Sequence, residues 1–451
     1  MTNKRYYIHG GTVINEGKRR KANIYIEEGK IARIVATDEK FSPSSDTTLI
    51  DATGCYIMPG AIDDQVHFRE PGLTHKAEIA TESRAAVAGG VTSFMEMPNT
   101  SPQTTDRVAW QWKMDRAAAT SAANYAFFPG GTNDNSDELL KFDPTRIPGV
   151  KLFLGSSTGN MLVDDAATLR RLFTELPFLI AVHCESEKMI RANRERFVAE
   201  HGEELGIEYH ARIRSAEACY ESSRKAVELA RECGTRLHLL HLSTAYEVAL
   251  LDRGELEQKR ITGEACVHHL WFTDADYATL GNRIKWNPAV KTEADRRAIR
   301  QAVADGVINI VATDHAPHLP AEKEGSCLKA ASGGPMVQHS LLLMLEMASQ
   351  GLFTPEMVVD RMAHSPARLF HIDRRGFIRE GYHADIAIVR PNAPWVVTPE
   401  TLLSKCGWSP MEGTTLSHQV EYTFVNGCLA YYDGKTIEHN GSEALRFNLY
   451  K

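Results

Sequence analysis

Five side chains that can take part in binding a metal ion stand far apart in the sequence, each beside a short apolar run. His67 comes shortly after AID, Lys151 opens KLFLG, His183 follows LIAV, His241 follows LHLL and Asp314 follows IVAT. Imidazole and carboxylate suit zinc, and a catalytic zinc site keeps a position open for water. Singly, each residue also fits a structural role, as a core histidine, a surface lysine or a helix cap. Jointly they predict a metal-dependent catalytic centre.

The first of these places departs by one residue from a paired-histidine metal motif. Where the usual pattern is His-x-His, this chain has Gln65-Val66-His67. A neutral amide oxygen is a weaker zinc ligand than imidazole, but it can bind. Three interpretations stay open: two metals with Gln65 or water as a weak ligand, one metal only, or a fold without chemistry. Because the other candidate ligands are all present, we expect an active enzyme with two metals, the buried one held more weakly.

The elements that must position these residues alternate along the middle of the chain. Apolar runs such as YIMPGAID, LIAVHCES and INIVATDHAP alternate with helical stretches such as KAEIATESRAAVAGG. Such alternation over roughly 300 residues predicts an α/β fold with a parallel sheet and helices outside. An eight-stranded TIM barrel is favoured over a doubly wound open sheet, because residues at several strand ends converge on one mouth in a closed barrel. No Gly-x-Gly-x-x-Gly follows a strand, so dinucleotide binding has no support.

Both ends of the chain instead predict short strands and tight turns. YYIHGGTVI and ADIAIVRP are rich in β-branched and aromatic residues, and Asn426-Gly427 and Asp433-Gly434 are hairpin turn signals. We therefore expect a small β-sandwich domain built from residues 1–54 and 382–451. The barrel would then span residues 55–381.

The composition excludes several other classes of protein. The formal net charge is -7, which gives no sign of a nucleic-acid partner. The N-terminus lacks the apolar core of a signal peptide and no apolar stretch is long enough to cross a bilayer, so we expect no membrane association and a cytoplasmic location. The 8 cysteines form no Cys-x-x-Cys pair, which favours reduced thiols over disulfides or a cysteine zinc site.

Longer motifs carry a resemblance over nearly the whole chain. They are PGAIDDQVHFREPGLTHK, AAVAGGVTSFMEMPNTSPQTT, NPAVKTEADR, VATDHAPH and LLSKCGWSPMEGTTL. With these motifs the chain resembles the dihydroorotases of the amidohydrolase superfamily, from about residue 8 to 432. The resemblance implies a distorted TIM barrel. It also implies a zinc-dependent hydrolase that interconverts N-carbamoyl-L-aspartate and L-dihydroorotate in pyrimidine biosynthesis, by metal-hydroxide attack on a cyclic amide.

The resemblance implies a metal-binding role for each candidate ligand. His67 and Asp314 would bind the more buried zinc, and His183 and His241 would hold the second. Lys151, carboxylated by carbon dioxide, would bridge the two ions, since a carbamate is an anionic oxygen donor whereas an ammonium group is repelled. A lysine can react in this way only if burial and a nearby cation lower its pKa. Asp314 would also carry the proton from water to the departing ring nitrogen.

The resemblance likewise implies a set of substrate-binding residues. Arg69, Asn99 and His318 would bind the substrate carboxylate, and Asn287 would contact the ring. Arg69 follows His67 by two residues, so both side chains share one face of a strand. A structural salt bridge is the alternative for Arg69. Allantoinases carry Asn at its place and hydantoinases lack the Arg-Glu-Pro-Gly run, so Arg69 favours a dihydroorotase.

Two rival functions remain beside this one. The first is another cyclic amidase, such as an allantoinase or a hydantoinase. The second is a non-catalytic scaffold that associates with aspartate transcarbamoylase. The resemblance also implies a homodimer, without any independent signature of its interface.

We expect structural roles for the remaining histidines near the motifs, which are His238, His268, His269 and His315. The stretch EKEGSCLKAASGGPM is expected to be either a loop that closes over substrate or a plain surface connection.

Overall fold

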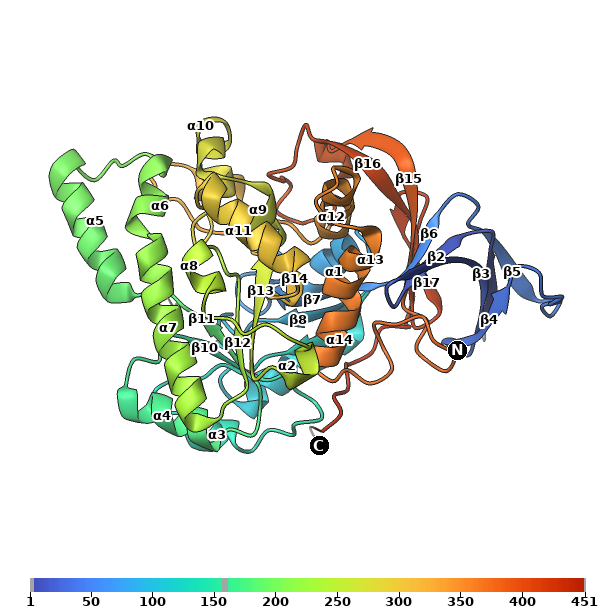
Figure 1. The fold of residues 1–451 in the computed structure, drawn as a ribbon, viewed down its shortest axis with the longest axis horizontal. Helices are drawn as coiled ribbons and strands as arrows, with labels where there is room; N and C mark the ends of the chain where they lie inside the picture. The colour runs from blue at the N-terminus through green and yellow to red at the C-terminus, as the bar shows by residue number, and fades with distance from the viewer. Residues whose placement is uncertain (1–3, 156–160, 450–451) are drawn as a thin grey trace.

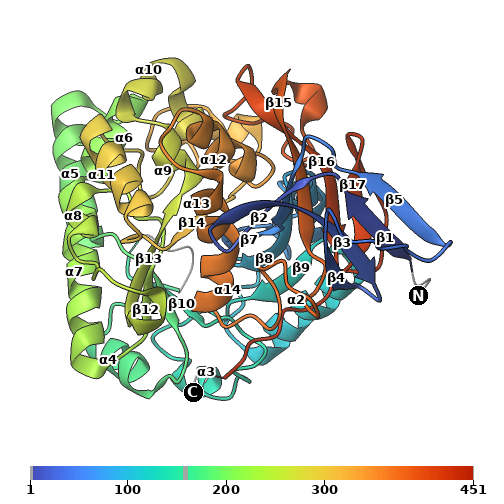
Figure 2. The same ribbon diagram turned by 45° about the vertical axis from the view of Figure 1, so that its right-hand side comes forward.

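A closed ring of eight parallel strands forms the centre of the molecule in this computed structural model, which describes residues 4–155 and 161–449 (Figures 1 and 2). A three-stranded sheet, β7-β8-β9, and a five-stranded sheet, β10 to β14, are joined by two parallel bridges, Gly130 with Lys151 and Val66 with His315. The strands of the ring are β7 Ala61–Val66, β8 Val91–Glu96, β9 Asn124–Phe127, β10 Val150–Phe153, β11 Ile180–His183, β12 Leu237–Leu239, β13 Ile261–Cys266 and β14 Ile310–Ala312. The expected TIM barrel is confirmed, and the open sheet is excluded, because the ring closes.

Helices cover the outside of this ring (Figure 1). The longer ones are α1 Ile79–Ala88, α2 Arg107–Thr120, α4 Ala166–Glu175, α5 Glu187–His201, α7 Ala216–Cys233, α11 Glu293–Ala304 and α12 Ser340–Ser349. The shorter ones are α3 Ser136–Leu139, α6 His210–Ile213, α8 Ala245–Val248, α9 Val267–Trp271, α10 Tyr277–Leu280, α13 Pro355–Val359 and α14 Ser365–Leu369. A π-helical turn, η6 Asp360–His364, joins α13 directly to α14.

Helix α7 shows why these segments are helical. Ser215 caps its first turn by accepting a hydrogen bond from the Ala218 N–H group. Ala218, Ser222 and Ala226 recur every four residues and are buried, so one small-residue stripe of the helix faces the barrel. Gly234 ends the helix in the left-handed conformation, with a φ of 70°, which glycine adopts without steric cost.

The two chain ends form a second sheet beside the barrel, the blue and red strands of Figures 1 and 2. Its strand order is β18-β17-β16-β15-β6-β2-β3-β1-β5, with β4 paired to β3. The strands are β1 Arg5–His9, β2 Thr12–Asn15, β3 Lys18–Glu27, β4 Lys30–Ala36, β5 Thr47–Asp51, β6 Tyr56–Pro59, β15 Ile386–Val396, β16 Thr415–Val425, β17 Cys428–Tyr432 and β18 Lys435–Thr436. The sheet curls around a core of its own that includes Ile8, Ile24, Ile57, Ile388 and Phe424. Residues of both chain ends therefore share one small β-domain.

Two hairpin turns join the last strands of the end sheet, and the residues after these strands leave the sheet. Asn426-Gly427 and Asp433-Gly434 connect β16, β17 and β18 with positive φ at all four residues, as their sequence predicts. Strand β6 lies in the end sheet although the sequence placed the limit at residues 54 and 55. The last residues of the expected segment 382–451 return to the barrel, where Leu445 and Phe447 pack with Phe128 and Ala181. Among the described residues, no helix is long and apolar enough to cross a membrane.

Candidate active site

All ten predicted site residues line one cavity of about 300 Å³ at the carboxyl end of the barrel strands. They are Gln65, His67, Arg69, Asn99, Lys151, His183, His241, Asn287, Asp314 and His318. The rest of its wall is formed by Phe153, Trp286, Ala316, Ala331 and Ser332, of which only Ala331 and Ser332 lie in a stretch that the sequence singled out, EKEGSCLKAASGGPM. Trp286 could have been found as the neighbour of Asn287 in WNPAVK. Parallel strands present their carboxyl ends at one mouth of a barrel, which explains how residues so far apart in sequence converge.

The side chains of His67 and Asp314 form one half of the cavity floor. His67 follows β7, and its Nε2 lies 3.0 Å from Asp314 Oδ1. Its Nδ1 lies 2.7 Å from Asn99 Oδ1, an oxygen that can only accept a hydrogen bond, so Nδ1 carries the hydrogen and Nε2 the lone pair. Burial lowers the pKa of His67 and favours this neutral ring. A lone pair and a carboxylate oxygen thus converge, as a cation site requires.

The Gln65 side chain lies in the same floor, but its amide oxygen, the atom that could bind a metal, points away from Asp314. Its Nε2 donates to Asp314 Oδ1 at 3.3 Å, and its Oε1 faces the Cys266 thiol, 3.8 Å from Sγ. Rotation about the last side-chain torsion would exchange the two amide atoms and present Oε1 toward Asp314. The position that a first histidine would occupy therefore holds a group that can bind a cation only after turning.

His183 and His241 form the other half of the floor. His183 ends β11 and His241 follows β12, and Nδ1 of the first lies 2.9 Å from Nε2 of the second. His183 Nε2 lies 3.1 Å from Glu185 Oε2, an ion-pair contact more than an aligned hydrogen bond. Burial alone would raise the pKa of Glu185. The ion pair with Arg214 and the contact with His183 outweigh burial and lower this pKa to about 2. An ionised Glu185 favours a proton on Nε2 of His183 and leaves Nδ1 free to bind a metal.

Burial lowers the pKa of both of these histidines, and that of His241 falls well below its ordinary value. Both rings are therefore neutral, which is the form that binds metals. Sequence reasoning missed Glu185, although its place two residues after His183 was a usable signal. Two imidazole nitrogens on one side and an imidazole with a carboxylate on the other match the donor set of zinc.

Lys151 lines the same cavity, inside β10 and only 1% exposed. Burial lowers the pKa of its amine from 10.5 to about 7. Its Nζ lies 4.6 Å from the centre of the Phe153 ring and has no hydrogen-bond partner among the described residues. A buried, unpartnered amine that is partly neutral at pH 7 is the form of lysine that can add carbon dioxide. The residues present thus fit a zinc centre with a lysine-derived bridge.

A cationic group lines the same cavity. The Arg69 Nε donates to Pro317 O at 3.0 Å, and its Nη2 lies 3.0 Å from His318 Nε2. Burial lowers the pKa of Arg69 to about 10, so the guanidinium stays charged at neutral pH. Burial and the neighbouring Arg69 and Lys76 hold His318 neutral by lowering its pKa. The structural salt bridge considered for Arg69 is not formed with the adjacent Glu70, because the Glu70 carboxylate pairs with Arg116.

Asn287 offers an unused acceptor in the same wall. Its Oδ1 is buried and has no hydrogen-bond partner among the described residues. An unpaired buried amide oxygen costs stability, so its presence in a cavity wall favours a ligand that donates to it.

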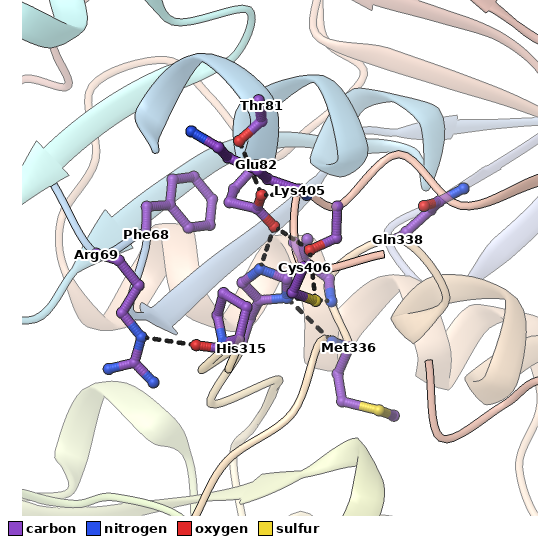
Figure 3. A network of polar contacts seen from close by, with 12 residues as sticks. Phe68, Arg69, Thr81, Glu82, His315, Met336, Gln338, Lys405 and Cys406 are labelled. Atoms are coloured by element: carbon purple, nitrogen blue, oxygen red, sulfur yellow. Dashed lines mark hydrogen bonds and ion pairs between the residues drawn. The ribbon is translucent and has the colours of Figure 1, made fainter. Parts of the chain in front are cut away.

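A polar network outside the cavity holds the loop that carries Asp314 (Figure 3). His315 Nδ1 accepts hydrogen bonds from the Met336 and Val337 N–H groups, so Nε2 carries the proton that it shares with Glu82 at 2.8 Å. Ser404 also donates to Glu82. This network agrees with the structural role expected for His315, because it ties helix α1 and the C-terminal segment to the loop of a site residue.

The other histidines expected to be structural lie outside the cavity wall. His268 stacks on Trp286 with ring centres 4.2 Å apart, and His269 Nε2 lies 3.1 Å from Pro288 O. His238 faces the barrel interior, where it contacts Asp64 and Glu264.

Hydrogen bonds hold the loop after His318 in place, because the buried Lys323 Nζ donates to Ala331 O and Gly333 O at 2.8 and 2.7 Å.

A family model described as the amidohydrolase family matches residues 56–430. The chain belongs to this family. This amidohydrolase is 33% identical over 433 residues to a dihydroorotase of Methanosarcina acetivorans, covering 93% of this chain and 91% of that one. It is 31% identical to an allantoinase of Bacillus velezensis, covering 95% and 94% of the two chains. It superposes on an L-hydantoinase (dihydropyrimidinase) from Arthrobacter aurescens with a TM-score of 0.92 at 25% identity, covering 99% and 100%.

These relatives support an amidohydrolase-family hydrolase of cyclic amides and confirm the resemblance noted in the sequence. Dihydroorotase, allantoinase and hydantoinase all occur among them, so the choice among the three depends on the site itself.

Proposed function

We propose that this amidohydrolase is a dihydroorotase that interconverts L-dihydroorotate and N-carbamoyl-L-aspartate. The observation that carries the proposal is the guanidinium of Arg69 in the wall of the same small cavity that the candidate metal ligands line. A charged, buried guanidinium favours a substrate with a carboxylate, which it can bind through two hydrogen bonds. Dihydroorotate carries such a carboxylate on its cyclic amide, whereas allantoin and unsubstituted hydantoin do not.

The residues of the cavity have matching roles in this proposal. Arg69 and the amide of Asn99 bind the substrate carboxylate, with His318 orienting the guanidinium. Asn287 Oδ1 accepts from a ring N–H group, which places the ring amide over the floor of the site. The carboxylate of Asp314 takes the proton of the attacking water and gives it to the ring nitrogen when the C–N bond breaks.

The proposal includes two zinc ions held by this chain's own donors. His67, Asp314 and, more weakly, Gln65 would hold one ion, and His183 with His241 would hold the other. Lys151, as its carbamate, would bridge them. Bound zinc lowers the pKa of water and polarises a carbonyl oxygen.

The test is turnover by the purified chain of four compounds: dihydroorotate, carbamoyl aspartate, allantoin and hydantoin. Each is assayed before chelation, after chelation and after zinc is restored. We expect interconversion of the first two only, lost with chelation and regained with zinc. Preferred turnover of allantoin or hydantoin would replace the proposal by a different cyclic amidase. No turnover of any compound by zinc-loaded protein would favour the scaffold function.

A further inference from the structure

Three charged or ionisable side chains meet inside the barrel, below the cavity. Asp64 comes from β7, His238 from β12 and Glu264 from β13, and one ligand atom of each lies within 4.8 Å of the others. Strands β13 and β14 separate β12 from β7 around the ring, so side chains that meet across them must point into its interior. All three side chains have no measurable exposure to solvent.

The distances within this cluster are those of metal ligands more than of ion pairs. His238 Nε2 lies 3.5 Å from Asp64 Oδ2 and 3.4 Å from Glu264 Oε2. A charge-assisted N–H···O bond is shorter, at about 2.7–2.9 Å. Two donors at tetrahedral angles around a zinc ion, each about 2.05 Å from it, lie about 3.4 Å apart. The histidine and the carboxylates are thus separated as a shared tetrahedral ion would separate them.

The hydrogen bonds around the cluster turn its inner atoms toward one another, where His238 Nε2 makes one long hydrogen bond, of 3.4 Å, with Glu264 Oε2. The Thr262 hydroxyl can donate to Leu237 O and accept from His238 Nδ1, 2.8 Å away, which places the lone pair of a neutral His238 on Nε2. Glu264 uses its other oxygen, Oε1, to accept from the His241 N–H group at 3.1 Å. Neither oxygen of Asp64 has a hydrogen-bond partner among the described residues.

A divalent cation also suits the ionised form of this cluster, which lies next to the apolar ring of Phe370, whose centre lies 6.0 Å from that of His238. Buried charges that are not neutralised are costly. A divalent cation with two carboxylates and a neutral imidazole makes the cluster electrically neutral.

We propose that Asp64, His238 and Glu264 form a structural zinc-type site within the barrel, distinct from the metal ligands of the cavity. The fourth position would hold one buried water molecule, enclosed together with the ion. Because the three side chains are fully buried, the ion would enter as the chain folds and exchange slowly afterwards. Its role would be to hold β7, β12 and β13 together beneath the residues that those strands present to the cavity.

A protonated His238 without any ion is the competing arrangement. Burial opposes a charged ring there, yet the carboxylates of Asp64 and Glu264 raise the pKa of His238 to about 9. An ion must therefore displace the protons that His238 and Glu264 hold without it.

The deciding experiment is anomalous diffraction at the zinc edge from crystals of the full chain refolded with zinc. The expected result is an anomalous peak between the side chains of Asp64, His238 and Glu264. A map with peaks only at the cavity ligands, or with none, would overturn the proposal. This outcome does not depend on activity, so a failure of the proposed function would leave the measurement valid.

Metal content in solution provides the matched comparison. Asp64→Asn keeps the size of the side chain and removes its charge, and it should reduce bound zinc by one equivalent per chain. His183→Asn, altered only at the cavity, should keep the equivalent that resists a chelator until the chain is unfolded. His238→Gln gives a second test if Asp64→Asn does not fold. Unchanged zinc content in the folded variants would contradict the proposal.

Discussion

Replacement of Arg69 by glutamine should remove selectivity for the substrate carboxylate while leaving the ring chemistry in place. The guanidinium is held by Pro317 O and by His318, and it lines the same cavity as the candidate metal ligands. Glutamine retains a hydrogen-bonding amide of shorter reach but loses the charge and the planar fork. The change should therefore affect recognition of an anion more than the attack on the amide.

The size of the effect follows from the burial of this group. The fall in the pKa of Arg69 from its ordinary 12.5 to about 10 means that the free site disfavours the charge by about 3 kcal/mol. A substrate carboxylate in contact with the guanidinium would offset a penalty of this order, and hydrogen bonds to charged groups contribute about 1.5–3 kcal/mol. A loss of about 3 kcal/mol corresponds to a decrease of kcat/KM of roughly 150-fold.

The assay compares two substrates that differ only in the carboxylate. Dihydroorotate and dihydrouracil share the ring, and dihydrouracil lacks the anion. We expect Arg69→Gln to lower kcat/KM for dihydroorotate by roughly 100-fold or more and to change that for dihydrouracil by less than about threefold. If dihydrouracil is turned over too slowly, its inhibition constant against dihydroorotate takes the place of kcat/KM. Thermal unfolding of both proteins controls for the lost bond to Pro317.

Two results would refute this reasoning. Equal losses with both substrates would mean that Arg69 supports the architecture of the site and does not contact the carboxylate. No loss with either substrate would mean that the anion binds elsewhere or that the substrate carries none.

Three further predictions concern the metal centre. Gln65→His should raise the affinity of the weaker cavity metal by about 10-fold or more, because imidazole is a better zinc ligand than an amide; isothermal metal titration checks this, and an unchanged titration would exclude position 65 as a ligand. Protein prepared with 13C-labelled bicarbonate should show a carbamate NMR signal that is absent from Lys151→Met. Because burial lowers the pKa of Lys151 to about 7, the reactive neutral amine declines as pH falls through that value, so carbamate formation in the metal-free protein should fall below pH 7. Glu185→Gln should weaken metal binding at His183 by about 10- to 100-fold. It also breaks the buried ion pair with Arg214 and should lower the unfolding midpoint, so metal affinity is titrated on protein that remains folded, where an unchanged affinity would indicate a structural role only.

Sequence alone determined which residues lie at the carboxyl ends of the barrel strands. Local periodicity marks the strands, and ring closure places all their carboxyl ends at one mouth, so His183, His241 and Asp314 could be assigned to one cavity without coordinates. Lys151 instead lies near the start of β10 and reaches the cavity from inside the strand. The hairpin turns at Asn426-Gly427 and Asp433-Gly434 were predictable for a similar reason, since their positive φ is encoded by two adjacent residues.

Contacts across the ring were decided by tertiary structure. The proton positions on His67 and His183 depend on Asn99 and Glu185, and the direction of the Gln65 amide depends on its neighbours from other strands.

The meeting of Asp64, His238 and Glu264 likewise required the closed barrel, because these residues come from strands that are distant in sequence and not all adjacent in space. Periodicity specifies the element on which a side chain lies and the face it takes. Distances of 3 to 4 Å between such side chains are set by the curvature and register of the closed ring, which no local stretch of sequence encodes.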